Sequence, residues 1–411
     1  MVRRVAKSHV VTGNSDLVRR LNRSLVLDLI RRKGPISRAD VKRITGLNFT
    51  TVTNAVTDLM AEGLVQEVGL GTSSGGRKPV LLTLNPTARY VLGCELQSAK
   101  LVVGLFDLAG HLVVRADLPM RPTDPPEAVV ERIATAADQV VKKAGVRPGL
   151  VEGLGVAAPG PLDPNEGVLL TPPNLHGWQS VPLRQMLESA TGLPVTVEKD
   201  GNAAALGEVW FGVGQSVQDL MLIIVDDGIG AGMTVGGRLY RGSIGGAGEI
   251  GHMTIDLDGP RCSCGNYGCL EAIASGFALG RKAQEMIRRG VHSLLAEAEE
   301  IGSAELLAAA EAGDELATDL LDECGRILGI AIANIVNLYN PELIVLAGRL
   351  AQRSDLVLDR AVELGRARAF SVLSEHVRIR RSALGERFLV AGAASLVLSE
   401  LLQGPVEVRP S

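Results

Sequence analysis

The sequence is poor in aromatic residues and cysteine and has no long apolar run. Phe, Trp and Tyr make up 3% of its 411 residues, whereas hydrophobic residues reach 46%. A core of this kind relies on Ala, Val and Leu, which together with 48 glycines favours an α/β protein of two or three domains. The sequence lacks a run of about eighteen apolar residues, so we expect no membrane span. Its basic N-terminus leads into polar residues, which argues against a signal peptide and for a cytoplasmic protein.

Three of the five cysteines lie in one short segment. Cys262, Cys264 and Cys269 follow His252, and thiolates and an imidazole at this spacing suit a tetrahedral Zn²⁺. Four protein ligands would leave no position for water, which predicts a structural zinc rather than a catalytic one. A disulfide or a buried, reduced cysteine cluster is the alternative.

Charge is distributed unevenly along the chain. The net charge is −4, but residues 1–80 contain 14 Lys/Arg and 6 Asp/Glu, which gives +8. The remaining 28 Lys/Arg and 40 Asp/Glu give −12. This polarity indicates that the first domain meets a polyanion.

The N-terminal 85 residues have the pattern of a winged helix-turn-helix. Apolar residues at helical spacing over residues 17–30 predict a first helix, and Ser37 is the expected N-cap of a short second helix. A turn at Thr45-Gly46-Leu47-Asn48 precedes a third helix with one apolar and one polar face. Strands over residues 65–68 and 80–84 would form a wing with a basic tip.

The third helix is the predicted recognition element, with DNA as the partner. Its polar face carries small hydroxyl and amide side chains that suit base edges and phosphates, and the wing adds basic side chains. A protein-interaction module with a merely solvated polar face is the alternative. The DNA contacts are predicted at Ser37, Arg38, Asn48, Thr50, Thr51, Thr53, Asn54, Arg77 and Lys78.

The remaining chain alternates strands and helices. Strands are expected over residues 90–95, 101–107 and 112–116, and a helix over residues 388–402. The fold class is therefore α/β, with two lobes of the actin-like, RNase H-like ATPase type that follow the N-terminal domain. The expected domains are residues 1–85 for DNA binding, 86–200 with 386–411 for a small lobe, and 201–385 for a large lobe with the zinc loop and the effector site.

A family resemblance rests on Glu249-Ile250-Gly251-His252 and on the Cys-x-Cys-Gly-x-x-Gly-Cys-Leu-Glu run that begins at Cys262. Together they resemble the signature of the ROK family, which groups bacterial sugar-responsive repressors, among them xylose-type repressors, with sugar kinases. The resemblance extends from about Tyr90 to the C-terminus. The N-terminal domain resembles the winged domains fused to ROK repressors, which the kinases generally lack.

The resemblance implies a sugar site. Pro173-Asn174-Leu175-His176-Gly177-Trp178 resembles a segment whose asparagine bonds a sugar hydroxyl. Glu198-Lys199-Asp200-Gly201-Asn202-Ala203 resembles the Glu-Asn-Asp-Ala-Asn-Ala motif, whose aspartate is the general base of the kinases. The alternative is that these acids cap helices or pair with arginines on the surface. The implied sugar contacts are Asn174, Asp200, Glu249, His252 and Glu271.

The nucleotide motifs depart from the family. Kinases carry Asp-x-Gly-Gly-Thr-Lys where this chain has Glu95-Leu96-Gln97-Ser98-Ala99-Lys100, so side chains crowd the approach of phosphate. Asp226 and Asp227 add negative charge at a second phosphate loop, and Arg349 stands in a third turn. We therefore predict a protein that is not an enzyme, in which Asp200 is a sugar ligand.

These inferences lead to one predicted function and two rivals. The function is a sugar-controlled transcriptional repressor of carbohydrate-metabolism genes, such as those of xylose. Its partners would be operator DNA, a sugar effector and further copies of the chain in a dimer or tetramer, with no membrane, and it would be nucleoid-associated. The first rival is an ATP-dependent, glucokinase-like sugar kinase with a DNA-binding domain. The second is a regulator whose cleft responds to a phosphotransferase protein.

Overall fold

The computed structural model describes residues 15–71 and 78–403. The chain divides into two units. The first comprises Met1–Arg89, Asp107–Ala109 and Leu398–Ser411, and the second comprises Tyr90–Phe106 and Gly110–Val397. Among the described residues no helix is long and apolar enough to cross a bilayer.

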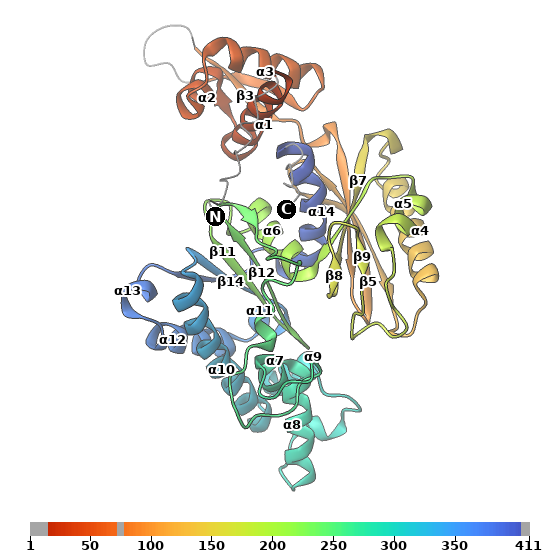
Figure 1. Cartoon of the computed structure of the whole chain (residues 1–411), viewed down its shortest axis with the longest axis vertical. Helices are drawn as coiled ribbons and strands as arrows, with labels where there is room; N and C mark the ends of the chain where they lie inside the picture. Colours follow the sequence, from red (N-terminus) through yellow and green to blue (C-terminus); the bar gives the residue numbers. More distant parts are fainter. Residues whose placement is uncertain (1–14, 72–77, 404–411) are drawn as a thin grey trace, which may run out of the picture. The chain divides into compact units, whose positions relative to one another are not determined.

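Three helices form most of the first unit (Figure 1). The Ser37 hydroxyl accepts a hydrogen bond from the Asp40 backbone N–H at 3.1 Å and so caps the second helix. Gly46 ends that helix at a φ of 73°, a conformation that favours glycine. The three predicted helices are therefore confirmed. They are α1 (Ser15–Lys33), α2 (Arg38–Thr45) and α3 (Phe49–Ala61).

A small antiparallel sheet completes the first unit. Its strand order is β1-β3-β2, so the two strands expected from the sequence pair directly. The additional two-residue strand β1 lies between α1 and α2 in sequence. The predicted DNA contact at Arg77 falls outside the described residues. The strands are β1 (Ile36–Ser37), β2 (Val65–Leu70) and β3 (Val80–Leu84).

Two five-stranded sheets with the same topology form the second unit. In each sheet three consecutive strands lie side by side, a later strand pairs in parallel with the first of the three, and the last strand pairs in parallel with that later strand. The sequence predicted two α/β lobes, and the sheets show that the lobes repeat one strand order. The small-lobe order is β6 (Leu112–Pro119), β5 (Lys100–Asp107), β4 (Tyr90–Leu96), β7 (Val151–Ala158) and β10 (Val195–Lys199). The large-lobe order is β13 (Arg238–Leu239), β12 (Ile229–Val235), β11 (Leu220–Val225), β14 (Leu343–Ala347) and β15 (Arg378–Arg381).

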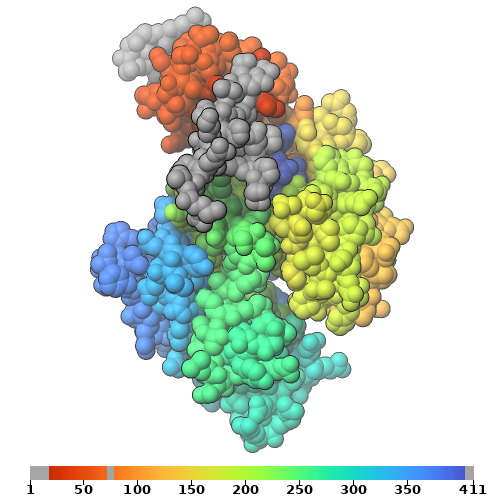
Figure 2. Space-filling view, in the orientation of Figure 1, coloured from red at the N-terminus to blue at the C-terminus, as the bar shows by residue number. Residues whose placement is uncertain are grey.

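Each lobe has its own apolar core. In the space-filling view the small lobe is mostly orange to yellow and the large lobe green to blue (Figure 2). In the small lobe the sheet packs against α4 and α5, and in the large lobe against α7 to α12. Helices of the small lobe are α4 (Pro126–Lys143) and α5 (Leu183–Thr191). Those of the large lobe are α7 (Leu270–Ala274), α8 (Gly276–Arg288), α9 (Ser303–Glu311), α10 (Glu315–Tyr339), α11 (Arg349–Arg353), α12 (Asp355–Arg368) and α13 (Ser371–Ser374). The short elements are β8 (Leu162–Asp163), β9 (Val168–Leu169), η1 (Pro86–Ala88), η2 (Pro148–Leu150), η3 (Ile250–His252), η4 (Leu294–Glu297) and η5 (Gly385–Arg387).

Two helices, α6 (Asp200–Phe211) and α14 (Phe388–Gln403), lie between the two sheets of the second unit (Figure 1). Helix α6 contacts β11 and β12 of the large lobe and also β7 and β10 of the small lobe. Helix α14 approaches α6 closely, because a Cβ atom on Gly392 would lie 2.4 Å from the carbonyl oxygen of Ala203. The N-terminus of α6, which begins at Asp200, therefore lies where the two lobes meet.

Candidate functional site

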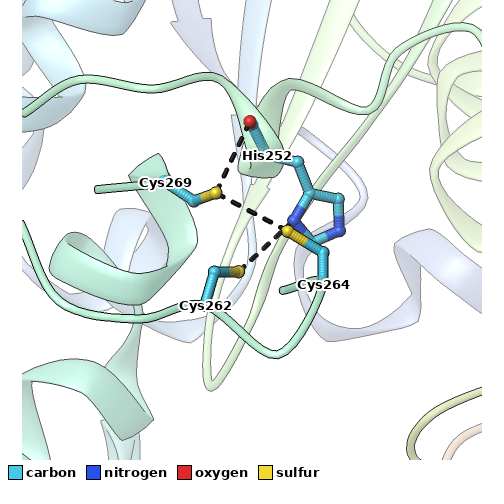
Figure 3. A group of neighbouring side chains, drawn as sticks. All are labelled: His252, Cys262, Cys264 and Cys269. Carbon is cyan, nitrogen blue, oxygen red and sulfur yellow. Dashed lines mark hydrogen bonds between the residues drawn. The ribbon is translucent and has the colours of Figure 1, made fainter. Parts of the chain in front are cut away.

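A cluster of one histidine and three cysteines lies in the large lobe, between β13 and α7 (Figure 3). His252 ends η3, Cys262 and Cys264 lie on the following loop, and Cys269 immediately precedes α7. The loop turns tightly because Gly268, at a φ of 64°, packs on the backbone, where a Cβ atom would lie 1.5 Å from the oxygen of Asp256. The four residues predicted as zinc ligands are thus brought together.

The spacing of the four ligand atoms fits a tetrahedral zinc ion. All of them lie within 4.8 Å of one another. The Sγ atoms of Cys264 and Cys269 are 3.7 Å apart, and Cys262 Sγ lies 3.6 Å from His252 Nδ1. Bonds of about 2.3 Å to sulfur and about 2.05 Å to nitrogen give tetrahedral edges of about 3.8 Å and about 3.6 Å. The cluster can therefore hold a metal ion, and its cysteines are free thiols rather than a disulfide.

The cysteines of the cluster shift one another's pKa values: that of Cys264 is lowered, chiefly by the Asn266 backbone N–H, and that of Cys269 is raised. Burial and the neighbouring thiols Cys262 and Cys264 raise the pKa of Cys269 to about 12. A thiol in that state stays protonated at neutral pH, whereas a bound divalent cation stabilises thiolates and removes the proton. His252 directs Nδ1 toward Cys262, so Nε2 is the ring nitrogen left for a second partner.

A second group of polar side chains lies at the N-terminus of α6. The pKa of the Asp200 carboxyl is raised to about 6, chiefly by burial and to a smaller extent by Glu249 and Glu271, against the opposing effects of the Gly201 N–H and the Lys199 ammonium. The electrostatic effects show that these carboxyl groups lie near one another. The structure thus brings together Asp200, Glu249 and Glu271, three of the predicted sugar contacts.

Two ion pairs beside Asp200 link β10 to the segment that follows β13. Lys199 Nζ donates to Glu249 Oε1 at 2.8 Å and to the Ala247 carbonyl at 2.9 Å. Arg241 Nε donates to Glu198 Oε2 at 2.6 Å. The sequence analysis missed the role of Arg241, although the adjacent opposite charges that end the apolar strand β10 are a signal for such pairing.

Glu271 also makes a structural hydrogen bond, whereas Asn174 is placed differently. Glu271 Oε2 accepts the Ile229 backbone N–H at 3.0 Å, which joins α7 to β12. Asn174 is exposed, and its neighbours Leu175 and Trp178 are buried in the small-lobe core. Across residues 78–403 no hydrogen bond joins the Asn174 side chain to the group around Asp200.

Arg349 is engaged with the two aspartates that follow β11. Its Nε donates to Asp226 Oδ1 at 2.8 Å, and Nη2 pairs with Asp227 Oδ2. Asp227 Oδ1 also accepts the Ser303 backbone N–H at 2.8 Å. The sequence analysis did not predict this pairing. The guanidinium instead joins the turn after β14 to the turn after β11.

In the first unit, the predicted DNA contacts fall into two groups. Thr50 and Asn54 are exposed on α3, and Lys78 is exposed before β3. Thr51 and Thr53 are half-buried. The second group has structural roles that the prediction did not include, and it consists of Ser37, Arg38 and Asn48.

The structural roles of that second group are visible in their hydrogen bonds. Ser37 is buried, and its hydroxyl both accepts from the Asp40 N–H and donates to the Asp40 carboxylate. Asn48 accepts the Thr51 N–H at 2.8 Å and so caps α3. Arg38 pairs with Glu67 of β2 at 3.1 Å. These side chains hold the helices in place rather than lying free on the surface.

Comparison with known proteins identifies relatives along almost the whole chain. A model of the ROK family matches residues 91–400. The xylose repressor of Caldicellulosiruptor bescii is 34% identical over 396 residues, which covers 96% of this chain and 99% of the relative. A solved ROK family transcriptional regulator, a homologue of the E. coli MLC protein, matches with a TM-score of 0.81 and 32% identity over 94% of this chain and 97% of its own.

A solved kinase matches a smaller part of the chain. The ROK family glucokinase from Streptomyces griseus, in complex with glucose and AMPPNP, has a TM-score of 0.67 and 31% identity. The match covers 98% of that chain but 75% of this one. The family model begins at residue 91, after most of the first unit, and the kinase match covers a smaller share of this chain than the regulator match does.

The two repeated sheets, the two cores and the added N-terminal unit define a mixed α/β protein with two lobes. The family match over most of the chain and the relatives that match from end to end place it within that class. The chain belongs to the ROK family.

Proposed function

We propose that this protein is a transcriptional repressor of carbohydrate-metabolism genes, controlled by a sugar bound beside Asp200. One observation carries the proposal: a three-helix unit with a polar, exposed helix face precedes the residues that the ROK model matches, and the regulator and the xylose repressor match 94% and 96% of this chain, whereas the glucokinase matches 75%. We interpret that unit as a winged helix-turn-helix, with α3 as the recognition helix and β2 and β3 as the wing.

The exposed face of α3 supports DNA binding. Thr50, Asn54 and Thr57 are exposed at positions i, i+4 and i+7, so they lie along one face of the helix. The opposite face, with Val52 and Val56, is fully buried. Hydroxyl and amide side chains in such a row suit the base edges and phosphates of a major groove. Two copies in a dimer would read half-sites about one helical turn apart.

The side chains around Asp200 support a polyhydroxyl effector. Carboxylates at Asp200, Glu249 and Glu271 accept charge-assisted hydrogen bonds, and adjacent sugar hydroxyls supply the matching donors. The effector alters DNA binding only through its different affinity for the two states of the protein. By family resemblance, release of the operator is the expected direction.

The metal cluster supports a structural zinc. Its three thiols and one imidazole are the ligands zinc prefers, and four of them leave no open position. Bound zinc would supply cross-linking of the loop and no reaction chemistry. Two of the metal ligands are close in sequence to residues of the proposed sugar site. His252 ends the short turn that follows Glu249, and Cys269 precedes the helix that carries Glu271.

Two features argue against phosphoryl transfer. Ser98 and Ala99 close a tight turn between β4 and β5, with the Gln97 N–H donating to the Lys100 carbonyl at 2.9 Å. This turn carries side chains where the kinases have glycines. Arg349 is already neutralised by Asp226 and Asp227, so it is not free to meet a phosphate.

The decisive experiment adds a panel of sugars to the complex of the protein with operator DNA and measures the affinity of the protein for the operator. We expect one sugar to change operator affinity, and the same sugar with Mg-ATP to release ADP no faster than a control without protein. Sugar-dependent ADP release at enzymatic rates would establish the kinase rival. An operator affinity that changes with cell extract but with no sugar would establish the phosphotransferase-protein rival.

The raised pKa of Asp200 predicts that effector binding weakens in acid. Sugar hydroxyls donate to the ionised carboxylate, which predominates above the pKa of about 6. Below that pH the carboxyl is protonated in the free protein, so affinity should fall about tenfold per pH unit. Isothermal titration of the active sugar between about pH 7.5 and about pH 5 measures the slope.

The Asp200→Asn variant is the control for this slope. The amide does not titrate, so its weaker binding should be independent of pH over the same range. An identical slope in the variant and the wild type would assign the pH dependence to another group.

A further inference from the structure

A glycine-rich segment, residues 240–249, follows β13 and is called here the strap. It contains neither helix nor strand. Gly242, Gly245 and Gly248 have φ angles of 71°, 83° and 81°, and Ile244 is 88% exposed. The strap has no hydrogen-bonded ladder, and one backbone hydrogen bond within it runs from the Ala247 N–H to the Arg241 carbonyl at 3.0 Å. Side-chain contacts therefore contribute to holding it.

Both ends of the strap are held by two adjacent residues of β10. Near its start, Arg241 pairs with Glu198 at 2.6 Å. At its end, Lys199 donates to Ala247 O at 2.9 Å and to Glu249 Oε1 at 2.8 Å. Glu198 and Lys199, which immediately precede Asp200, therefore each form an ion pair with the strap.

The β10 side chains in these two ion pairs are buried. The side chains of Glu198 and Lys199 are 2% and 9% exposed, whereas those of Arg241 and Glu249 are 43% and 51% exposed. If the strap lifted away, the buried Lys199 ammonium would lose both of its hydrogen-bond partners, and Glu198 would lose its ion pair and keep only the Asn202 amide and the Lys199 backbone N–H. Leaving a buried ammonium unpaired is strongly unfavourable.

The pairing fixes what Glu249 can offer to a ligand. One carboxylate oxygen is occupied by Lys199, and no hydrogen bond occupies the other oxygen within the described strap and its neighbours. The ammonium has three donors, of which Ala247 and Glu249 take two. Because the two charges cancel, the pair presents one acceptor and one donor without net charge.

We propose that Lys199 is a positioning residue that selects an uncharged polyhydroxyl effector by holding Glu249 and the strap in place. This inference rests on the proposed function and names the ligand class of the same site. A ligand hydroxyl donates to the second oxygen of Glu249, and a ligand oxygen accepts from Lys199. A sugar acid is repelled by the carboxylates of the site. An amino sugar gains no attraction from Glu249, because Lys199 already neutralises that carboxylate.

The test compares the full-length wild type with Lys199→Met, and with Lys282→Met as the matched control. Lys282 also pairs with a glutamate, Glu323, but on the large lobe away from the strap. Hydrogen exchange over residues 242–248 should be about tenfold or more faster in Lys199→Met and unchanged in Lys282→Met, because the strap loses its grip. Equal exchange in Lys199→Met and the wild type would overturn the role of Lys199.

Ligand selectivity is a second measurement, and a purely structural role of Lys199 would leave it unchanged. Four probes are titrated: D-xylose, D-glucose, D-glucosamine and D-xylonate. The wild type should bind a neutral sugar in preference to both charged probes. In Lys199→Met the unpaired Glu249 carboxylate should shift the ratio of amino-sugar to neutral-sugar affinity by about tenfold toward the amino sugar. An unshifted ratio, or a wild type that prefers a charged probe, would overturn the selectivity.

Two further outcomes separate this inference from the proposed function. Lys199→Arg keeps a cation beside Glu249 and should restore strap protection and the neutral preference, which excludes a folding defect as the cause. If none of the four probes binds the wild type, the proposed sugar control fails, whereas the exchange comparison still decides whether Lys199 holds the strap.

Discussion

Replacing Cys264 with serine is expected to lower zinc affinity by about 100-fold and to weaken the response of operator binding to sugar. A serine hydroxyl is a poor ligand for zinc, so one of four bonds is lost. Cys264 is exposed, unlike Cys262 and Cys269, and its replacement leaves the apolar core unchanged. The effect should therefore be specific to the metal loop.

The loss should reach the effector site through the chain on either side of the cluster. His252 follows Glu249 by one short 3-10 turn, and Cys269 directly precedes α7, which carries Glu271. Besides the metal ligands, these two segments are joined by backbone hydrogen bonds, among them the Leu270 N–H to the Met253 carbonyl at 2.9 Å, so zinc would add a cross-link to an existing contact. Metal content and sugar titrations of operator binding measure the two effects.

Ser263→Ala is the matched control for this substitution. Ser263 is exposed on the same loop, and its hydroxyl lies 3.9 Å from Cys262 Sγ without being a ligand. This variant should retain both metal and sugar response. A Cys264→Ser protein that carries no metal and responds fully to sugar would remove zinc from the proposed mechanism.

Local signals made the first unit predictable from sequence. Ser37 three residues before Asp40 indicates a helix start, and Gly46 indicates a helix end, so α2 could be placed closely. Helical periodicity likewise identified the buried face of α3. The strand order of the two lobes was not predictable in this way, because pairing such as that of β11 with β14 joins residues more than 100 positions apart.

The candidate site was likewise predictable where its residues are close in sequence and not where they are far apart. The His/Cys cluster lies within eighteen residues of sequence, so ligand spacing alone predicted it. Arg349 and its partner Asp226 are separated by 123 positions, and Arg241 and Glu198 by 43. No spacing rule connects such residues. Only the fold, which places the turns of neighbouring strands side by side, shows that these charges neutralise each other.

Replacing Asn54 with alanine is expected to reduce operator affinity by roughly 5- to 150-fold, while affinity for random DNA changes little, because a base contact is worth about 1–3 kcal/mol. Asn54 is exposed at the middle of the polar row of α3, and an asparagine amide can both donate to and accept from an adenine edge. Competition binding with operator and random duplexes measures the ratio.

Two comparison variants give that ratio its meaning. Lys78→Met removes an exposed cation next to the wing, so it should weaken operator and random DNA equally and lower the salt slope by about one. Asn48→Ala removes the cap of α3 and should cost about 1 kcal/mol of stability rather than selectivity. If Asn54→Ala behaves like Lys78→Met, with equal losses on both duplexes, Asn54 contacts phosphate and the sequence of the operator is read elsewhere on α3.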